Sequence, residues 1–300
     1  MHNEVKGKQL TAEIIGELAV RALRIEAAVT PKPGLVDREN SGAHDDMDYP
    51  LFLASSAALL PCFIACAKAG IDGYKKNPAQ LVPILRRIGR CGETAMYAAT
   101  KGVNTHKGAI FSMGILCCAL GMLVARAAKG KAAVVRNTAA YLTEAELQAL
   151  CAALSAALLR QETAAATHGL YARGHAACGG VREEAASGFA TAFQVGLPVL
   201  RDALCEGAMQ ETALVKTLLA LIARTEDSNT AYRGGAGGLA FMQKTAEEIL
   251  RRADWKSEEG LDMVREFDRA CIRRHLSPGG SADLLAFSAM LLMIFDEVSL

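Results

Sequence analysis

The sequence predicts an all-α protein, a single compact multi-helix domain over residues 1–300 with long functional loops between its helices. Hydrophobic residues make up 51% of the 300 residues, Ala and Leu are abundant, and aromatic residues account for only 5%. No sustained alternation of Val, Ile or Thr indicates a strand. Apolar residues instead recur at helical spacing, and we found no internal repeat and no stretch with the length and polarity of a domain linker.

The first helix is predicted to end near Val29. Its apolar positions follow one face at helical spacing: Ile14, Leu18, Ala22, Ile25 and Val29. Thr11 stands where an N-cap is needed, and Pro31 and Pro33 stop the helix. The polar segment from Pro31 to Tyr49 then predicts a loop, and it is long for a simple connector, which favours a functional role.

Further helices follow along the chain. The best marked of them opens with "TEAE", in which Thr143 and Glu146 form a capping box. The predicted ranges are 50–68, 79–99, 107–128, 144–161, 182–208, 211–224, 239–252, 260–274 and 282–298.

Charge and cysteine content exclude several classes of protein. Lys and Arg number 33 against 32 acidic residues, which leaves no field of one sign for nucleic acid or an anionic membrane. The nine cysteines form neither a disulfide framework nor a zinc knuckle, and the polar N-terminus lacks a signal peptide's apolar stretch. We therefore expect a cytoplasmic protein with no nucleic-acid partner.

Two apolar stretches raise the question of a membrane. The stretch from Leu284 to Phe295 is too short to span one, and that from Ala109 to Ala125 contains Ser and Gly and lies just under the usual length of about 20 residues. Both are predicted to be buried core helices, so we expect no membrane contact.

Five polar, Gly-rich patches interrupt the apolar helices. They are residues 30–48 ("TPKPGLVDRENSGAHDDMD"), 102–108 ("GVNTHKG"), 167–185 ("THGLYARGHAACGGVREEA"), 226–238 ("EDSNTAYRGGAGG") and 275–283 ("HLSPGGSAD"). Any one of them could be an ordinary connection between helices, because Gly, Asn, Asp and Pro are what turns require. Five patches dense in Asp, His, Arg and Lys together indicate a site.

The first patch can supply ligands for a hard cation. It places Asp37, His44 and several further carboxylates in a short span, among them Asp46 and Asp48. Mg²⁺ is typically held by one or two carboxylates together with substrate phosphates, so a metal–triphosphate is one reading and a solvated acidic loop is the other.

Two patches can bind an anion at a helix N-terminus. In "GVNTHKG", Asn104 or Thr105 can cap the helix that begins near Lys107, but Lys107 precedes Gly108, so this is not a Walker A loop. The glycine run after Arg233 is a second candidate.

His168, His175 and Cys178 form only a weak zinc signal, and Arg182 can pair with a neighbour or a phosphate. Serine-hydrolase and dinucleotide-binding motifs are missing from the sequence.

In sequence order, these patches resemble the triphosphoribosyl-dephospho-CoA synthases that serve citrate lyase and malonate decarboxylase. The resemblance rests on "TPKPGLVDRENSGAHDDMD", "GVNTHKGAIFSMG", "THG", "DSNTAYRGG" and "SPGGSADLLA", spread over nearly the whole chain. Two departures are Ser228, where Thr is expected, and the Gly-Val join before Arg182, where a Gly-Ala-Arg-like join is expected.

The resemblance implies a transferase that converts ATP and 3′-dephospho-CoA to 2′-(5″-triphosphoribosyl)-3′-dephospho-CoA and adenine. The product is passed to a transferase that modifies an acyl carrier protein, and the small-molecule reaction is the same for citrate lyase and malonate decarboxylase. Two alternatives remain at this point: an all-α metal-dependent hydrolase similar to ADP-ribosylglycohydrolases, and a non-catalytic helical protein that binds nucleotide or a partner.

The patches and the resemblance together give the expected site residues. For the acid/base or oxocarbenium role we expect Asp37, His44, His106 or Asp227, and for Mg²⁺ we expect Asp46 and Asp48. The expected substrate-binding residues are Lys32, Gly34, Asn40, Asn104, Thr105, Lys107, Gly108, His168, Arg182, Asn229, Arg233, Gly234, Ser277, Gly279 and Asp283. The last three, with Gly280, are expected to shape the pocket floor, and a helix cap at Ser281 would account for them equally well.

Overall fold

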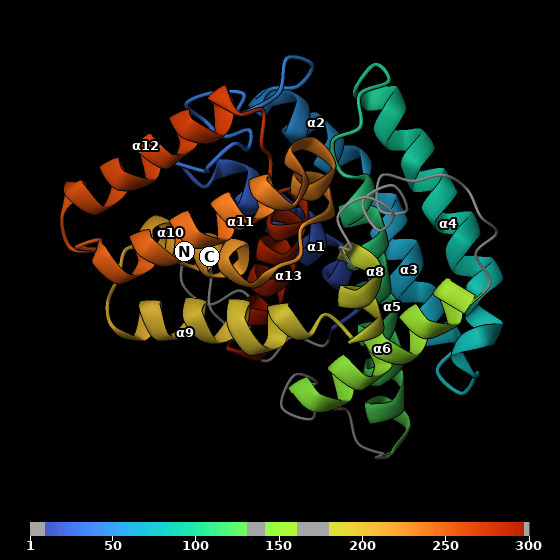
Figure 1. Ribbon diagram of the computed structural model, residues 1–300. Helices are drawn as coiled ribbons and strands as arrows, with labels where there is room; N and C mark the ends of the chain where they lie inside the picture. Colours follow the sequence, from blue (N-terminus) through green and yellow to red (C-terminus); the bar gives the residue numbers. More distant parts are fainter. Residues whose placement is uncertain (1–9, 131–141, 161–179, 297–299) are drawn as a thin grey trace.

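The computed structural model describes residues 10–130, 142–160, 180–296 and 300, and the ordered elements in these ranges are helices. Figure 1 shows α13 (Gly279–Phe295) in the middle of the assembly, with α12 (Glu258–Arg273) on one side and α4 (Pro78–Ala99) on the opposite side. The all-α prediction is confirmed.

The first helix, α1 (Ala12–Ala28), agrees with the sequence prediction. The Thr11 hydroxyl oxygen accepts from the Ile14 amide at 3.3 Å, and Val29 is the C-cap of the helix. The predicted loop follows, without a helix until α2 (Tyr49–Ala58) begins behind its N-cap Asp48.

The predicted single helix over 50–68 is wrong. The chain forms α2 and then α3 (Leu60–Asp72), with the break at Leu59. Pro61 explains the break, because it has no N–H to donate to the carbonyl of the preceding turn.

The helices α4, α5 (Lys107–Gly130) and α6 (Glu144–Arg160) match their predicted ranges within two residues. The closest backbone approach in this part of the fold lies between α3 and α5. A Cβ atom on Gly70 would lie 2.0 Å from the Cys118 carbonyl oxygen, and one on Gly121 would lie 2.1 Å from the Ala67 oxygen. Only glycine permits this packing at both positions.

The predicted helix over 182–208 is also wrong. The chain forms α8 (Gly180–Ala186), a π-helical turn η2 (Ala192–Gly196) and α9 (Leu197–Cys205). Gly188 and Phe189 adopt φ angles of +75° and +62°. Phe189 is buried against Phe287, with ring centroids 4.7 Å apart, so core packing stabilises a turn that a phenylalanine does not favour on its own.

The C-terminal helices are α10 (Gln210–Arg224), α11 (Ser228–Arg252), α12 and α13. The predicted start of α13 is wrong, since it begins at Gly279 rather than 282. The helix α11 begins at Ser228 rather than 239, although a kink at Gly235 separates its first turns from the segment predicted over 239–252. The polar residues taken for loops form first turns here. The glycine run lies inside α11, where Gly235 kinks the helix with φ +62°.

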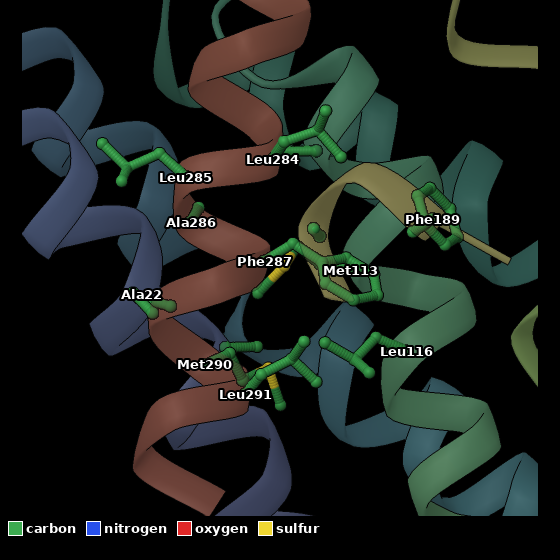
Figure 2. Close-up of a cluster of buried hydrophobic side chains, with 14 of the residues drawn as sticks. Ala22, Met113, Leu116, Phe189, Leu284, Leu285, Ala286, Phe287, Met290 and Leu291 are labelled. Atoms are coloured by element: carbon green, nitrogen blue, oxygen red, sulfur yellow. The ribbon is translucent and has the colours of Figure 1, made fainter. Parts of the chain in front are cut away.

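The core is built around α13, which packs against α1, α5, α9 and α10. Figure 2 shows Phe287 and Met290 of α13 between Ala22 of α1 and Met113 and Leu116 of α5. Helices from both ends of the described chain therefore bury the same apolar surface. The assignment of residues 1–300 to one domain stays a prediction.

Among the residues that the structure describes, two helical stretches are long and apolar enough to cross a membrane, by length and composition alone. In their most apolar windows, Tyr49–Asp72 is 39% buried and Lys107–Ala128 is 83% buried. The helix around Ala109–Ala125 is thus packed inside the protein, as expected of a core helix, and the shorter helix around Leu284–Phe295 is buried as well.

Candidate active site

The polar patches converge near the first turns of α5, α11 and α13. The Asp227 carboxylate, at the start of α11, accepts from the Ser281 amide of α13 at 2.9 Å. A Cβ atom on Gly108 of α5 would lie 2.0 Å from Oδ2 of Asp283 in α13. The loop 30–48 joins them, because His44 Nε2 lies 2.9 Å from Ser277 Oγ. Segments distant in sequence therefore form one polar region.

Asp227 holds two helix starts together. Its Oδ1 accepts from the amides of Asn229 and Thr230 at 3.0 and 3.1 Å, and its Oδ2 accepts from the amide and hydroxyl of Ser281. Burial raises the pKa of this carboxyl, and these hydrogen bonds oppose the rise. Because both oxygens are engaged, the geometry favours a scaffold role, and the predicted catalytic role stays a prediction.

Asp37 plays a role within the first loop like that of Asp227 between the two helices. Its two oxygens accept from the backbone amides of Lys32, Glu39 and Asn40 at 3.0, 2.7 and 2.9 Å. The side chain is 2% exposed. Asp37 thus fixes the conformation of the loop that carries His44, and its predicted catalytic role is also untested.

Asp268 of α12 anchors the same loop, and the sequence analysis missed it. Its carboxylate accepts from the Gly34 amide at 2.8 Å and from the Asn40 side-chain amide at 2.9 Å. Burial is the main cause that raises its pKa. A signal was present: Asp268 shares the buried face of α12 with Val264 and Cys271, and an acid at a core position requires partners.

His44 lies between Ser277 and Arg233. The Arg233 guanidinium donates to Nδ1 at 3.2 Å, so Nδ1 accepts and the proton is on Nε2, which donates to Ser277 Oγ. Burial and the Arg233 charge lower the pKa of His44. Arg233 also donates to the Ala43 carbonyl at 2.9 Å, so it clamps the loop against α11.

A buried ion pair lies behind these groups. Lys32 Nζ donates to Glu26 Oε1 at 2.6 Å and to the Glu26 carbonyl at 2.8 Å, and the two side chains are 1% and 5% exposed. Glu26 was also missed. It extends the buried stripe of α1 beyond Ala22 and Leu23, and a charged residue on that stripe was the available signal.

Asp283 is a partly buried acid beside this pair. Burial raises the pKa of its carboxyl well above the ordinary range, and the nearby charges of Glu26 and Asp227 raise it further. Its Oδ2 faces the glycine at the start of α5. Such a carboxyl holds its proton more tightly than an exposed acid does, which is the property required of a general acid.

His106 is 3% exposed, and its ring is held by a hydroxyl and by an aromatic edge. Nδ1 lies 2.7 Å from Ser55 Oγ, the Phe52 ring centroid lies 4.9 Å away, and Nε2 has no partner among the described residues. Burial and the charge of Lys32 lower the pKa of His106 to about 3. The ring is therefore neutral near pH 7.

A pocket opens beside Asp283, between α8, α11 and α13. Four acids line it: Glu184, Glu226, Asp227 and Asp283. Glu184 is engaged by the amide and hydroxyl of Thr191 at 2.8 and 2.7 Å. A cavity with this lining disfavours a bare phosphate and suits hydroxyl groups, amino groups or a metal-bound anion.

Several predicted residues lie at exposed positions around this region. Asp48 caps α2 through the Leu51 amide, and the Asp46 side chain is 63% exposed, with Oδ1 3.9 Å from His44 Nδ1. Lys107 pairs with Glu93 at 3.4 Å on the surface. His168 lies outside the described residues.

The remaining predicted residues are placed as follows. Arg182 lies in α8, near the pocket through Val181, and Asn104 accepts from the first amide of α5 at 3.3 Å. Most predicted residues do converge: Lys32, Gly34, Asp37, Asn40, His44, Thr105, His106, Gly108, Asp227, Asn229, Arg233, Gly234, Ser277, Gly279 and Asp283.

The acids of the first loop do not form a ready-made metal cage. No group of three or more His, Cys, Asp or Glu side chains is arranged to hold a metal ion within residues 10–130, 142–160 and 180–296. The assignment of Mg²⁺ to Asp46 and Asp48 stays a prediction, and an ion held by only one or two protein carboxylates requires no such group.

Comparison with known proteins identifies relatives along nearly the full chain. A protein of Pectobacterium atrosepticum named "2-(5''-triphosphoribosyl)-3'-dephosphocoenzyme-A synthase" is 43% identical over 281 residues, which cover 92% of this chain and 88% of that protein. A protein of Vibrio cholerae serotype O1 (strain M66-2), named "Probable 2-(5''-triphosphoribosyl)-3'-dephosphocoenzyme-A synthase", is 40% identical over 277 residues, covering 91% and 85%. No solved structure matches significantly.

The family match agrees with the motif-based resemblance. Residues 12–299 match the sequence model of the family described as "CitG: ATP:dephospho-CoA triphosphoribosyl transferase". Because this match includes every polar patch and the relatives are similar over about nine tenths of the chain, the protein belongs to the ATP:dephospho-CoA triphosphoribosyl transferase family.

Proposed function

We propose that this chain transfers the triphosphoribosyl group of ATP to 3′-dephospho-CoA and releases adenine. The observation that carries the proposal is the family match over residues 12–299, with polar patches that meet at one site. In the reaction the bond between ribose C1″ and adenine breaks, and a bond from C1″ to the 2′-oxygen of dephospho-CoA forms. The hydroxyl proton leaves, and adenine departs with a proton.

The charge in this reaction develops at the ribose and on adenine, whereas the triphosphate remains intact. Catalysis therefore requires a proton donor for adenine, stabilisation of an oxocarbenium-like ribose, and an anchor for the phosphates. Asp283 fits the donor role, because it is a partly buried acid of raised pKa at the pocket wall. Of the predicted catalytic residues, His106 is the one with an unengaged ring nitrogen among the described residues, whereas the polar atoms of Asp37, Asp227 and His44 all have partners.

For the phosphates we propose the surface beside this pocket. Lys107, at the first turn of α5, is half-exposed and can exchange Glu93 for a phosphate. Mg²⁺ would arrive bound to ATP and take ligands from Asp46 and Asp48, both of which lie in or next to the loop that His44 belongs to.

The alternatives from the sequence are less favoured. A hydrolase similar to ADP-ribosylglycohydrolases, or a non-catalytic binding protein, agrees less well with relatives that are named synthases. We further propose a cytoplasmic location and transfer of the product to an enzyme that modifies an acyl carrier protein of citrate lyase or malonate decarboxylase.

The test is to incubate the protein with ATP, Mg²⁺ and dephospho-CoA and to identify the products by mass. Adenine together with a triphosphoribosyl adduct supports the proposal, adenine without any need for dephospho-CoA supports the hydrolase, and ADP or AMP contradicts the transferase. Asp283→Asn should lose most of the adenine release, whereas Asp262→Asn, at an exposed acid on α12, should retain it.

A further inference from the structure

A short chain of hydroxyl groups contacts the ring of His106. The Thr105 hydroxyl donates to Ser55 Oγ at 2.7 Å, and Ser55 Oγ lies 2.7 Å from His106 Nδ1. Ser55 is fully buried in α2, while Thr105 and His106 precede α5. The sequence analysis did not select Ser55.

The direction of these hydrogen bonds determines the tautomer of the ring. A serine hydroxyl carries one hydrogen, and Ser55 Oγ already accepts the hydrogen of Thr105. The hydrogen of Ser55 is therefore free to go to Nδ1, which must then be unprotonated. In a neutral ring the remaining proton is on Nε2.

The Nε2–H group then lacks an acceptor. His106 is 3% exposed, and Nε2 is a buried side-chain atom with no hydrogen-bond partner in the described part of the chain. Buried donors are nearly always paired, so this nitrogen points to an acceptor atom that a bound molecule supplies.

The surrounding charges favour a neutral acceptor. Lys32, whose charge acts on His106, is already paired with Glu26 at 2.6 Å. The carboxyl of Asp283 faces Gly108, two residues after His106, so a phosphate placed against the buried Nε2 would lie near these acids, whereas Lys107, the phosphate anchor proposed above, is half-exposed. A ring nitrogen of a purine or an oxygen of a ribose meets no such repulsion.

We propose that Ser55 is a positioning residue, which with Thr105 keeps the proton of His106 on Nε2, so that this N–H binds a neutral acceptor on the nucleoside part of the nucleotide. The tautomer follows from Thr105 donating to Ser55, and only the identity of the ligand rests on the proposed function. His106 then acts as a fixed hydrogen-bond donor instead of an acid or a base.

The tautomer can be measured without substrate. Nitrogen-15 NMR of histidine-labelled protein, with His106 assigned by its absence in His106→Asn, should show a neutral ring protonated on Nε2. Ser55→Ala and Thr105→Val should give a mixture of tautomers, and Thr105→Ser, which keeps the hydroxyl, should restore the wild-type spectrum. Ser56→Ala is the matched control, because Ser56 is equally buried on α2 but donates to the Leu53 carbonyl.

Binding measurements test the ligand. Ser55→Ala and Thr105→Val should weaken ATP binding about two- to tenfold, the usual range for one hydrogen bond, and should leave tripolyphosphate binding unchanged. Thr105→Ser and Ser56→Ala should bind ATP like wild type.

Different results would overturn different statements. A wild-type ring protonated on Nδ1, or a tautomer unchanged by both variants, would refute the role of Ser55. Equal weakening of tripolyphosphate binding would refute the nucleoside assignment. ATP binding that follows the expected pattern in a protein that forms no triphosphoribosyl adduct would refute the proposed function and leave the role of Ser55 intact.

Discussion

Replacing Lys32 by methionine should be among the most destabilising single changes near the site. Methionine approximates the volume of the lysine stem but removes the ammonium that lies 2.6 Å from Glu26 Oε1. Glu26 is left as a buried carboxylate that faces a second acid, since the charges of Glu26 and Asp283 already oppose each other. The change therefore breaks an ion pair in a place where water cannot replace the lost partner.

The expected loss of unfolding free energy follows from the burial of both Lys32 and Glu26. Removing one member of a buried pair costs about 3–5 kcal/mol of unfolding free energy, because the other charge remains without a partner. Lys32 and Glu26 are 1% and 5% exposed, so this range applies. Changing Glu26 to Gln as well removes the stranded charge, and the double variant should be more stable than Lys32→Met alone, with a coupling free energy of about 2–3 kcal/mol.

The assay is urea denaturation of the wild type, both single variants and the double variant. A matched control is available on α11, where Arg252 and Glu248 lie 2.7 Å apart with side chains 61% and 51% exposed. Arg252→Met should cost no more than about 0.5 kcal/mol, because that pair is solvated. The reasoning fails if Lys32→Met costs less than about 1 kcal/mol, or if the two single changes add without coupling.

Three further predictions concern the same region. The pKa of His106 is lowered to about 3 in the folded protein, against about 6.5 when unfolded, so the unfolded chain binds more protons between these values. Stability should therefore be lost as pH falls from about 6.5 towards 3. In this window, His106→Gln should flatten the plot of urea midpoint against pH. Equal slopes of this plot for the wild type and the variant would contradict the assigned burial of His106. Gly108→Ala should lower the unfolding free energy by about 1–3 kcal/mol and reduce adenine release, because its Cβ would lie 2.0 Å from Asp283. As a control, Gly89→Ala, whose Cβ would have nothing within 4 Å, should stabilise α4 by about 0.5–1 kcal/mol. Similar urea midpoints for the two variants would refute the steric argument. Asp227→Asn should lower the unfolding free energy by about 1–3 kcal/mol in urea titration, since its NH₂ group would face either the Ser281 amide of α13 or the Asn229 and Thr230 amides of α11. A loss below about 0.5 kcal/mol would show that one oxygen suffices.

Local signals predicted much of the fold. The first helix was bounded correctly because Thr11 and the prolines act on their own neighbours, and the start of α5 was correct because its cap, Asn104, is also a local signal. The errors have two causes. Phe189 turns the chain to reach the core, so packing overrode local preference there. Ser228 begins a helix because Asp227 caps it, which is a local signal that the sequence analysis missed.

The site residues divide in the same way. Their types were visible in the patches, since Asp, His and Gly in short polar runs contrast with the apolar helices around them. The role of each of these residues could not be predicted from the sequence. Asp37 and Asp227 were expected to be catalytic, yet their oxygens are occupied by backbone amides, and that is a property of distances between segments far apart in sequence.

By itself, the sequence determined the helical class, the family and the set of polar patches, because composition, periodicity and motif spacing are properties of neighbouring residues. Only the tertiary structure decided which polar groups are free. It buried Glu26 with Lys32, joined Asp268 to the first loop and placed Ser55 against His106. The physical reason is that pairing, burial and proton position depend on which distant segments meet, and the free energy of a polar group is set by those partners.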